Sequence, residues 1–218
     1  MKLLSVSGIR RALVIAPHPD DETIAAFGLL NHLTRQGTKI SIVVVTDGTA
    51  SHKSALWPGQ RLALKRRAES RLAMLKVGIA AGAIRFLNYP DSELASIAPQ
   101  DFERLVRRLS DGPEPDLVIR PTLHDFHSDH QCVARASVSA WPPRVRQLTY
   151  RVWPDDQLHH FKPLWRLPLT SDLSRRKAAA IRIYKTQTGL IHDDPDGFCM
   201  DRDLIARFSG PDEVFGEA

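Results

Sequence analysis

Short, uninterrupted apolar runs alternate along the chain with longer segments in which apolar residues recur every three or four positions. An uninterrupted apolar run predicts a strand buried on both faces, and the three-to-four spacing predicts an amphipathic helix. The tail from His192 is expected to be irregular, because it is rich in Asp and Gly. The predicted strands are residues 12–16, 39–46, 83–87, 116–120 and 148–153. The predicted helices are residues 21–37, 60–77, 102–109, 130–140 and 174–188.

Strands that alternate with helices imply an α/β fold, a Rossmann-like and mostly parallel sheet flanked by helices on both faces. No internal repeat, low-complexity stretch or linker divides the 218 residues, so residues 1–218 are expected to form a single domain. A domain of this length buries a large core without disulfide bonds. The two cysteines, Cys132 and Cys199, are therefore expected to be free thiols.

The formal net charge of +5 comes from basic residues that are scattered over several predicted helices. They are not interleaved with aromatic residues, so we expect no nucleic-acid binding, although an anionic substrate is compatible with the charge. No apolar run is long enough to span a membrane, and the start MKLLSVSGIRR lacks the charge order and cleavage site of a signal peptide. We therefore expect a cytoplasmic protein.

Three carboxylates and an imidazole follow the first predicted strand, as His18, Asp20, Asp21 and Glu22. Like charges this close repel one another, and burying them is unfavourable unless something cationic compensates. A metal ion is the simplest compensation. The missing ligands can therefore be sought elsewhere in the chain.

A second polar cluster, His124 to His130, follows the predicted strand 116–120. That strand is expected to lie beside strand 12–16 near the centre of the sheet. Ligands of such sheets bind outside the carboxyl ends of the strands, so both clusters are expected to face one site.

A catalytic zinc takes about three protein ligands and leaves one position open for water. His18, Asp21 and His130 can supply two imidazoles and one carboxylate. Asp20 is adjacent to a ligand and could take a proton from metal-bound water.

His127 lies three residues before His130 and could face the open side of the metal. When protonated, it could donate to a developing oxyanion or to a leaving amine. The Asp129 carboxylate could hold the His127 imidazole by a hydrogen bond, which would favour its charged form.

A purely structural interpretation treats the acids after strand 12–16 as first-turn helix residues, each stabilised by about 0.3–1 kcal/mol through the helix dipole. This explains one or two acids but neither His18 nor the second histidine cluster, so metal binding is favoured. Glu22 is expected to support or cap the site. No role is assigned to His52, His124 or Asp125.

The stretch Ala16-Pro-His-Pro-Asp-Asp-Glu22 resembles the HPDDE signature of the LmbE/PIG-L-like N-acetylglucosamine deacetylases, and His127-Ser-Asp-His130 resembles their H-x-D-H motif. The two motifs together are much more specific than either alone. Further stretches similar to the family's are Thr46-Asp-Gly48, Arg66-Arg-Ala-Glu69, Leu87-Asn-Tyr-Pro-Asp91, Lys177 and Thr186-Gln187.

The resemblance implies that His18, Asp21 and His130 bind zinc and that Asp20 is the general base. It also implies roles for residues of the second cluster and for two positions between the motifs. His127, oriented by Asp129, would act as an acid or stabilise the oxyanion, and Arg66 and Asp91 resemble positions that contact the sugar.

The expected protein is therefore a zinc-dependent hydrolase that removes an acetyl group from the amide of an N-acetylglucosamine-type sugar conjugate. Fe²⁺ is an alternative metal for such a site. The expected partner is a small acetylated sugar or glycoconjugate, and the sequence is compatible with a homo-oligomer.

Three other interpretations stay open, and the least favoured is a basic polymer-binding protein, which only the high isoelectric point suggests. A zinc hydrolase of a non-sugar amide or imide would use the same metal chemistry. A non-catalytic nucleotide- or sugar-binding module is weakened because no G-x-G-x-x-G follows the first strand. The substrate pocket is expected to be shaped by the loop 49–60 and by the segment 150–172, with Trp153, His159, His160 and Trp165.

Overall fold

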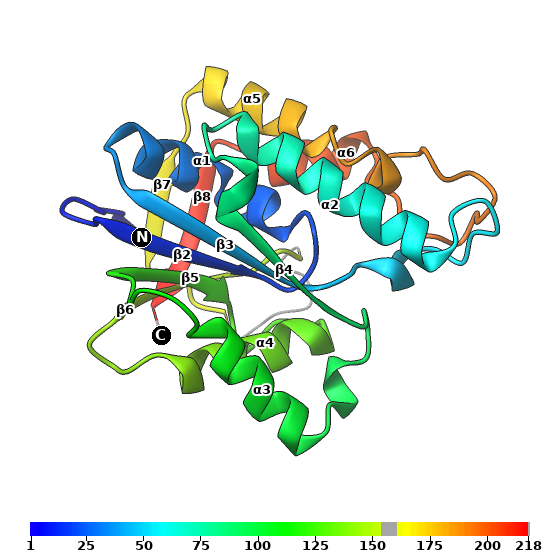
Figure 1. Ribbon diagram of the computed structural model, residues 1–218. Helices are drawn as coiled ribbons and strands as arrows, with labels where there is room; N and C mark the ends of the chain where they lie inside the picture. The colour runs from blue at the N-terminus through cyan, green and yellow to red at the C-terminus, as the bar shows by residue number, and fades with distance from the viewer. Residues whose placement is uncertain (154–160, 218) are drawn as a thin grey trace.

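The computed structural model describes residues 1–153 and 161–217, and its centre is a sheet in the order β1-β7-β8-β6-β5-β2-β3-β4 (Figure 1). The strands are β1 (Lys2–Leu3), β2 (Arg11–Ala16), β3 (Lys39–Thr46), β4 (Ile84–Tyr89), β5 (Leu117–Pro121), β6 (Arg146–Tyr150), β7 (Trp165–Pro168) and β8 (Asp212–Glu217). The run from β4 to β6 is parallel throughout, whereas β8 pairs antiparallel with both β6 and β7. The expected α/β class is therefore confirmed.

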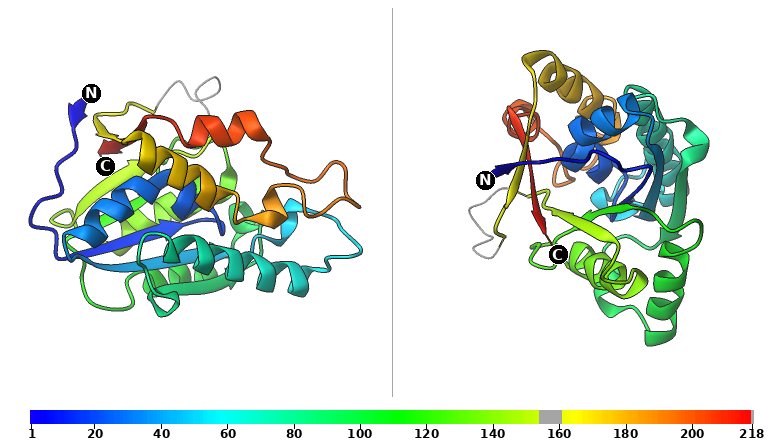
Figure 2. Two further views of the ribbon diagram at one scale, coloured as in Figure 1. Left: turned by 90° about the horizontal axis from the view of Figure 1, so that it is seen from above. Right: turned by 90° about the vertical axis from the view of Figure 1, so that its left-hand side faces the viewer.

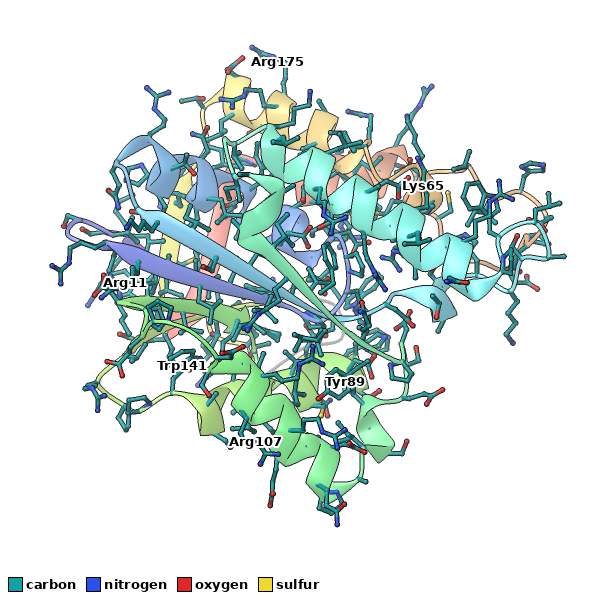
Figure 3. The ribbon with its side chains drawn as sticks, in the orientation of Figure 1. Arg11, Lys65, Tyr89, Arg107, Trp141 and Arg175 are labelled. Atoms are coloured by element: carbon teal, nitrogen blue, oxygen red, sulfur yellow. The ribbon has the colours of Figure 1, made fainter. Side chains whose placement is uncertain are left out.

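Helices cover both faces of this sheet, and Figure 2 shows them as separate layers. The helices are α1 (Asp21–Arg35), α2 (Gly59–Leu75), α3 (Pro99–Leu109), α4 (Ser128–Ala140), α5 (Ser171–Ile181) and α6 (Arg202–Phe208). Side chains of α1, α2, α5 and α6 pack on one face, and those of α3 and α4 pack on the other. Tyr89 and Trp141 lie on the α3/α4 side (Figure 3).

Strand β2 shows why the central strands are apolar without interruption. Val14 and Ala16 point into the core beneath α1, while Leu13 and Ile15 point into the core beneath α3 and α4. Because neighbouring residues of a strand face opposite sides and both sides of β2 are covered, all five of its buried positions are apolar.

Several element boundaries differ from the expectation. The strand expected at 148–153 is β6, Arg146–Tyr150, and the helix expected at 174–188 is α5 followed by the short 3-10 turn η5 (Lys185–Gln187). The expectation of an irregular tail from His192 is wrong, because that segment contains α6 and β8.

These elements were missed for physical reasons. Helix α6 has only seven residues, too few for a clear period, and β8 contains Gly216 and three acids, which are uncommon in strands. Strands β1 and β7 are also short, and β1 is exposed while β7 is only partly buried. Tertiary pairing at the edge of the sheet defines them, rather than local pattern.

Both cysteines are free thiols, as expected, with Cys132 buried and Cys199 exposed. Within the part of the chain that the structure describes, no helix combines the length and the apolar character that crossing a membrane requires.

Candidate metal and catalytic site

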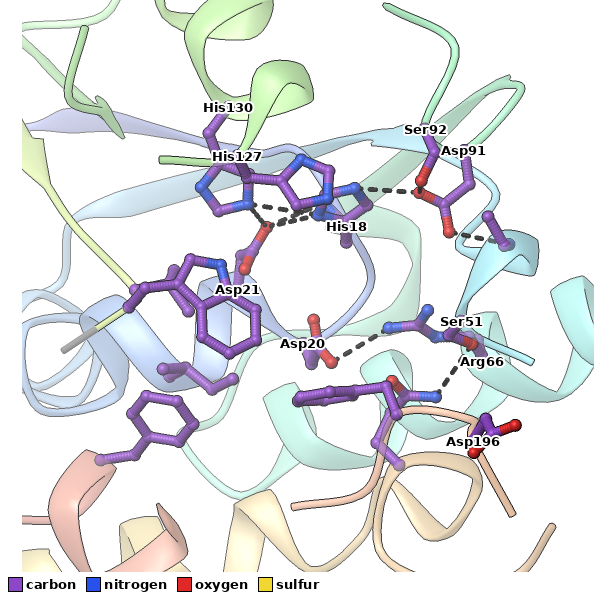
Figure 4. Close-up of a pocket in the computed structure, with 17 residues that line it drawn as sticks. His18, Asp20, Asp21, Ser51, Arg66, Asp91, Ser92, His127, His130 and Asp196 are labelled. Atoms are coloured by element: carbon purple, nitrogen blue, oxygen red, sulfur yellow. Dashed lines mark hydrogen bonds and ion pairs between the residues drawn. The ribbon is translucent and has the colours of Figure 1, made fainter. Parts of the chain in front are cut away.

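The two polar clusters meet at the carboxyl ends of β2 and β5, which are neighbouring parallel strands. His18 and Asp21 lie where β2 passes into α1, and His130 lies in the first turn of α4, just after β5. The close-up in Figure 4 shows the three side chains converging on one side of a pocket. The topology therefore brings together residues that are far apart in sequence.

Three donor atoms form a nearly regular triangle. His18 Nδ1 lies 3.2 Å from His130 Nε2 and 3.4 Å from Asp21 Oδ2, and the third side, from His130 Nε2 to Asp21 Oδ2, is 3.3 Å. Ligand atoms about 2.0–2.1 Å from a tetrahedral metal ion lie about 3.3–3.4 Å from one another. The three residues could therefore hold a metal ion without rearrangement.

Carboxylates hold the remaining nitrogen of each of these two imidazoles. His18 Nε2 lies 3.1 Å from Asp91 Oδ1 and 3.2 Å from Asp129 Oδ2. His130 Nδ1 lies 3.0 Å from Asp125 Oδ2. Such partners fix the ring orientation of metal-binding histidines and make the ligating nitrogen more basic.

Neighbouring carboxylates raise the pKa values of His18 and His130. Burial alone would lower the pKa of His130, but Asp21 and Asp125 raise it to about 9. Burial would likewise lower the pKa of His18, but hydrogen bonds to Asp129, Asp21 and Asp91 raise it well above its usual value. A bound cation would take the place of these protons, because ligating imidazoles must be neutral.

A second set of donor atoms, on His18, His127 and Asp129, is also close enough to hold a metal ion. Its members are already engaged, however. The Asp129 carboxylate accepts backbone N–H groups of Ser92 and Leu94 at 2.8 and 3.1 Å. His127 Nδ1 accepts the Asp129 backbone N–H at 3.2 Å. We therefore favour the triangle of His18, Asp21 and His130.

Asp20 is buried directly beside this triangle, and its carboxylate faces the pocket (Figure 4). Its backbone φ of 148° is a conformation that side-chain-bearing residues rarely adopt. Strain of this kind is concentrated at functional sites. Burial raises the pKa of Asp20 to about 7, although the nearby Arg66 guanidinium lowers it.

Arg66 supports Asp20 from α2. Its Nη2 donates to Asp20 Oδ2 at 3.0 Å and to the Pro19 carbonyl at 2.9 Å, and its Nη1 donates to the Gly48 carbonyl at 2.6 Å. Gly48 has φ +70°, and a Cβ there would lie 2.5 Å from Arg66 Nη1. The Thr-Asp-Gly turn therefore needs glycine because the guanidinium approaches the backbone so closely.

His127 is oriented differently from the expectation. Among the described residues, no hydrogen bond joins the Asp129 carboxylate to the His127 ring; instead the Asp129 backbone N–H donates to His127 Nδ1. Helix α4 begins at Ser128, so His127 is the N-cap residue, whose side chain accepts a free backbone N–H of the first turn. Burial and the charges of His18 and His130 lower the pKa of His127, so its charged form is disfavoured rather than favoured.

Arg66 and Asp91, the two expected sugar contacts, both line the pocket. Both are also engaged with the protein: Arg66 with Asp20, and Asp91 with His18 and, at 2.9 Å, with the Ala50 backbone N–H. Their observed contacts therefore position other site residues.

Two supporting carboxylates complete the site. Glu22 Oε2 accepts the Asp20 backbone N–H at 3.1 Å, and its other oxygen accepts hydrogen bonds from Ser70 and Tyr184, which agrees with the expected supporting role. Asp125 is 1% exposed and had no role assigned from sequence. The signal that points to it is chemical, because a metal-binding His130 needs a partner for its second nitrogen.

The pocket has a volume of about 380 Å³, and one wall of it is apolar. This wall consists of Ile24, Val152, Trp153, Phe198 and Phe208. The last two come from the tail that was expected to be irregular, so sequence reasoning missed them.

Of the segments expected to shape the pocket, the loop after β3 contributes Ala50 and Ser51. Trp153 lies in the wall, whereas Trp165 belongs to β7 and is not among the lining residues. His159 and His160 lie outside the described residues.

A mostly parallel α/β sheet with a His–Asp–His triangle at its carboxyl edge, beside a buried carboxylate, is an α/β protein whose site could hold a metal ion and has the layout of an enzyme. The family model described as PIG-L, GlcNAc-PI de-N-acetylase, matches residues 13–141, which is more than half of the chain. The chain belongs to this family.

Two curated relatives match parts of the chain. Diacetylchitobiose deacetylase of Thermococcus kodakarensis is 26% identical over 126 residues, which are 56% of this chain and 46% of that protein. The match therefore spans less than half of that relative's length. A probable N-acetyl-alpha-D-glucosaminyl L-malate deacetylase 2 of Bacillus cereus is 28% identical over 153 residues, covering 66% of this chain and 67% of the relative.

Solved structures confirm the fold. N,N'-diacetylchitobiose deacetylase of Pyrococcus horikoshii superposes with a TM-score of 0.71 at 22% identity, covering 97% of this chain and 84% of that one. GalB, a 4-carboxy-2-hydroxymuconate hydratase of Pseudomonas putida, superposes with a TM-score of 0.70 at 16% identity, covering 95% of each chain. The fold is thus shared by a deacetylase and a hydratase, and only the site can indicate the reaction.

Proposed function

We propose that this protein is a metal-dependent hydrolase that removes the acetyl group from the amide of an N-acetylglucosamine-type sugar. The observation that supports this most directly is the triangle of His18, Asp21 and His130, with the Asp20 carboxylate beside it in one pocket. Membership of the PIG-L family and the names of both curated relatives agree with this reaction.

We propose that the metal is zinc, because two imidazoles and one carboxylate are a common donor set for catalytic zinc. Bound there, zinc would supply a water with a pKa near 7 and a Lewis acid for the amide oxygen. Fe²⁺ suits the same donors, so metal analysis of the purified protein decides between the two.

Asp20 is proposed as the general base. Its carboxylate accepts a proton from the attacking water while Arg66 holds one of its oxygens. The water oxygen bonds to the amide carbon, the C–N bond then breaks, and the proton passes to the leaving nitrogen. The products are acetate and a free amine.

His127 is proposed to stabilise the oxyanion in its neutral form. Because its Nδ1 accepts a hydrogen bond, the ring proton of a neutral imidazole must be on Nε2. His127 lines the pocket, so this N–H can donate to the oxygen of the tetrahedral intermediate. Asp129 acts on His127 through its backbone and on His18 through its carboxylate.

The pocket favours a neutral sugar conjugate over one that carries malate carboxylates. Among the described lining residues, Arg66 is the only Lys or Arg, and its Nη atoms are engaged with Asp20 and two backbone carbonyls. Asp91 and Asp196 add negative charge to the lining, and the opposite wall is apolar.

The test is acetate release from three amides by zinc-loaded protein: N,N'-diacetylchitobiose, an N-acetylglucosaminyl malate, and an N-acetylated amine without a sugar ring. We expect the highest kcat/KM for the neutral disaccharide and little turnover without the sugar ring. Preference for the amine without a ring would support the alternative, a hydrolase of non-sugar amides. Preference for the malate conjugate would contradict the proposed selectivity for neutral conjugates, but it would still support sugar-amide deacetylation.

We further propose that residues 1–218 act as one domain, because one sheet joins strands from β1 to β8 and the pocket draws on segments from His18 to Phe208. The cytoplasmic localisation and the homo-oligomer stay predictions of the sequence.

A further inference from the structure

Among the described residues, a buried arginine without a carboxylate partner lies on the face of the sheet that α3 and α4 cover. Arg120, in β5, is only 2% exposed. Its Nε donates to Gln147 Oε1 at 2.6 Å and its Nη1 to the Pro121 carbonyl at 3.0 Å. Within the described residues it makes no ion pair, although arginine is almost never fully buried unless it is paired.

Arg120 lines a cavity of about 580 Å³ between β5, β6, the end of β8 and the end of α4. None of the residues around this cavity belongs to the lining of the metal pocket. Its volume lies in the range typical of sites for small molecules.

Further hydrogen-bond donors line this cavity. The indole Nε1 of Trp141, which lies on the α3/α4 side in Figure 3, is buried and has no partner within the described chain. Gln147 Oε1 accepts a hydrogen bond from Arg120, so the side-chain amide N–H groups of Gln147 remain as donors. The Thr149 side chain is 6% exposed and adds a hydroxyl.

Acceptors are scarce by comparison. Glu217 is the only carboxylate among the described lining residues; it is exposed and makes no ion pair with Arg120. Burial lowers the pKa of Arg120 to about 10. A ligand with negatively charged oxygens would satisfy the guanidinium and the neighbouring donors together.

We propose that this cavity is a second binding site, for a small organic anion whose carboxylate or phosphate group binds Arg120. The apolar side chains of Leu123, Val138 and Trp141 line the same cavity and would contact the body of the ligand. The site is distinct from the metal pocket, but the two are joined by one loop. Thr122 and His124 line the cavity directly before Asp125, the partner of His130.

The test uses benzoate and phenyl phosphate as probes, titrated calorimetrically into the full chain in low-chloride buffer. Each titration is done with zinc-loaded protein and with chelator-treated protein, because an anion could also bind a metal ion. We expect saturable binding of at least one probe that survives metal removal. Stronger binding of benzoate would indicate a carboxylate ligand, and stronger binding of phenyl phosphate would indicate a phosphate ligand.

Arg120→Met is expected to weaken this binding about ten- to hundredfold, because charge-assisted hydrogen bonds are lost. The control is Arg144→Met, which removes the same charge from an exposed side chain that pairs with Glu114, and it should bind normally. If Arg120→Met does not fold, Thr149→Val decides, and a several-fold loss of affinity is expected. No metal-independent binding by the wild type, or unchanged affinity in the Arg120 or Thr149 variant, would overturn the proposal.

Discussion

Asp20 is fixed by two contacts and by its backbone conformation. Its backbone N–H is held by Glu22, its carboxylate by Arg66, and its unusual φ of 148° turns the side chain into the pocket. This preorganisation suits a proton acceptor, because the carboxylate need not move when the water reacts.

Asp20→Asn should therefore retain the metal and lose turnover by about 10²- to 10⁴-fold, the usual contribution of a general base. The measurement is kcat together with the metal content of each preparation. Asp111→Asn, the same change at an exposed residue paired with Arg85, is the control. Near-normal turnover of metal-loaded Asp20→Asn would exclude Asp20 as the base.

Asp125 is a positioning residue. Its carboxylate forms hydrogen bonds with His130 Nδ1 and with the His127 backbone N–H. Asp125→Ala should weaken metal binding about 10- to 100-fold, as for other carboxylate partners of metal-binding histidines. Competition with a chromogenic chelator measures this affinity. An unchanged affinity would show that His130 needs no such partner.

The sequence predicts most of the residues that meet at the site, because it points to all three triangle residues and to Asp20. The contacts of Asp129 and Asp91 were not. Both carboxylates reach His18 only because the loop after β4 folds against the start of α4, and Ser92 and Leu94 donate their N–H groups to Asp129. Such tertiary contacts leave no local pattern in the sequence.

At the scale of elements, helix α1 is interrupted at Ala26, where φ is −139°. Glu213 from β8 enters the gap and accepts the N–H groups of Gly28 and Leu29, each at 2.8 Å. Lys177 from α5 neutralises Glu213 at 2.8 Å. The break therefore ties α1 to β8 and α5.

Lys177→Met should lower the free energy of unfolding by about 3–5 kcal/mol, because it leaves the buried Glu213 carboxylate without its cation. Urea denaturation measures the loss. The double variant Lys177→Met/Glu213→Gln should lose less than the sum of the two single variants, since the pair is coupled. A loss below about 1 kcal/mol in Lys177→Met would show that this pair behaves like an exposed one.

The turn after β3 contacts the site through Gly48, whose carbonyl accepts a hydrogen bond from Arg66 of α2. Gly48→Ala should lower both stability and activity, because the backbone has φ +70° and the new methyl group would displace Arg66 from Asp20. Gly37→Ala is the matched control, since Gly37 has φ +82° but nothing lies within 4 Å of a Cβ there. We expect about 1–2 kcal/mol of destabilisation in Gly37→Ala and a larger loss in Gly48→Ala, with kcat/KM reduced in Gly48→Ala alone. Equal activity in the two variants would contradict the proposed support of Asp20 by Arg66.

At the scale of the whole molecule, the parallel part of the sheet was predictable and its antiparallel extension was not. Most buried positions of β2, β3 and β5 are apolar because helices cover both faces of these strands, and Thr46 and Arg120 are the exceptions. This apolar composition is visible in the sequence. Strand β8 is defined by pairing with β6 and β7, and its residues include three acids. The aromatic pocket wall was missed together with it, because Phe198 and Phe208 belong to the same tail.

The central claim is that one metal ion, held by His18, Asp21 and His130, makes this protein a deacetylase. The most direct measurement is acetate release from N,N'-diacetylchitobiose while zinc is added back to chelator-treated protein. We expect no release at the start, a linear rise, and saturation at one zinc per chain, with no saturating step in His130→Ala. Acetate release by the stripped protein, or no release at one bound zinc per chain, would contradict the account.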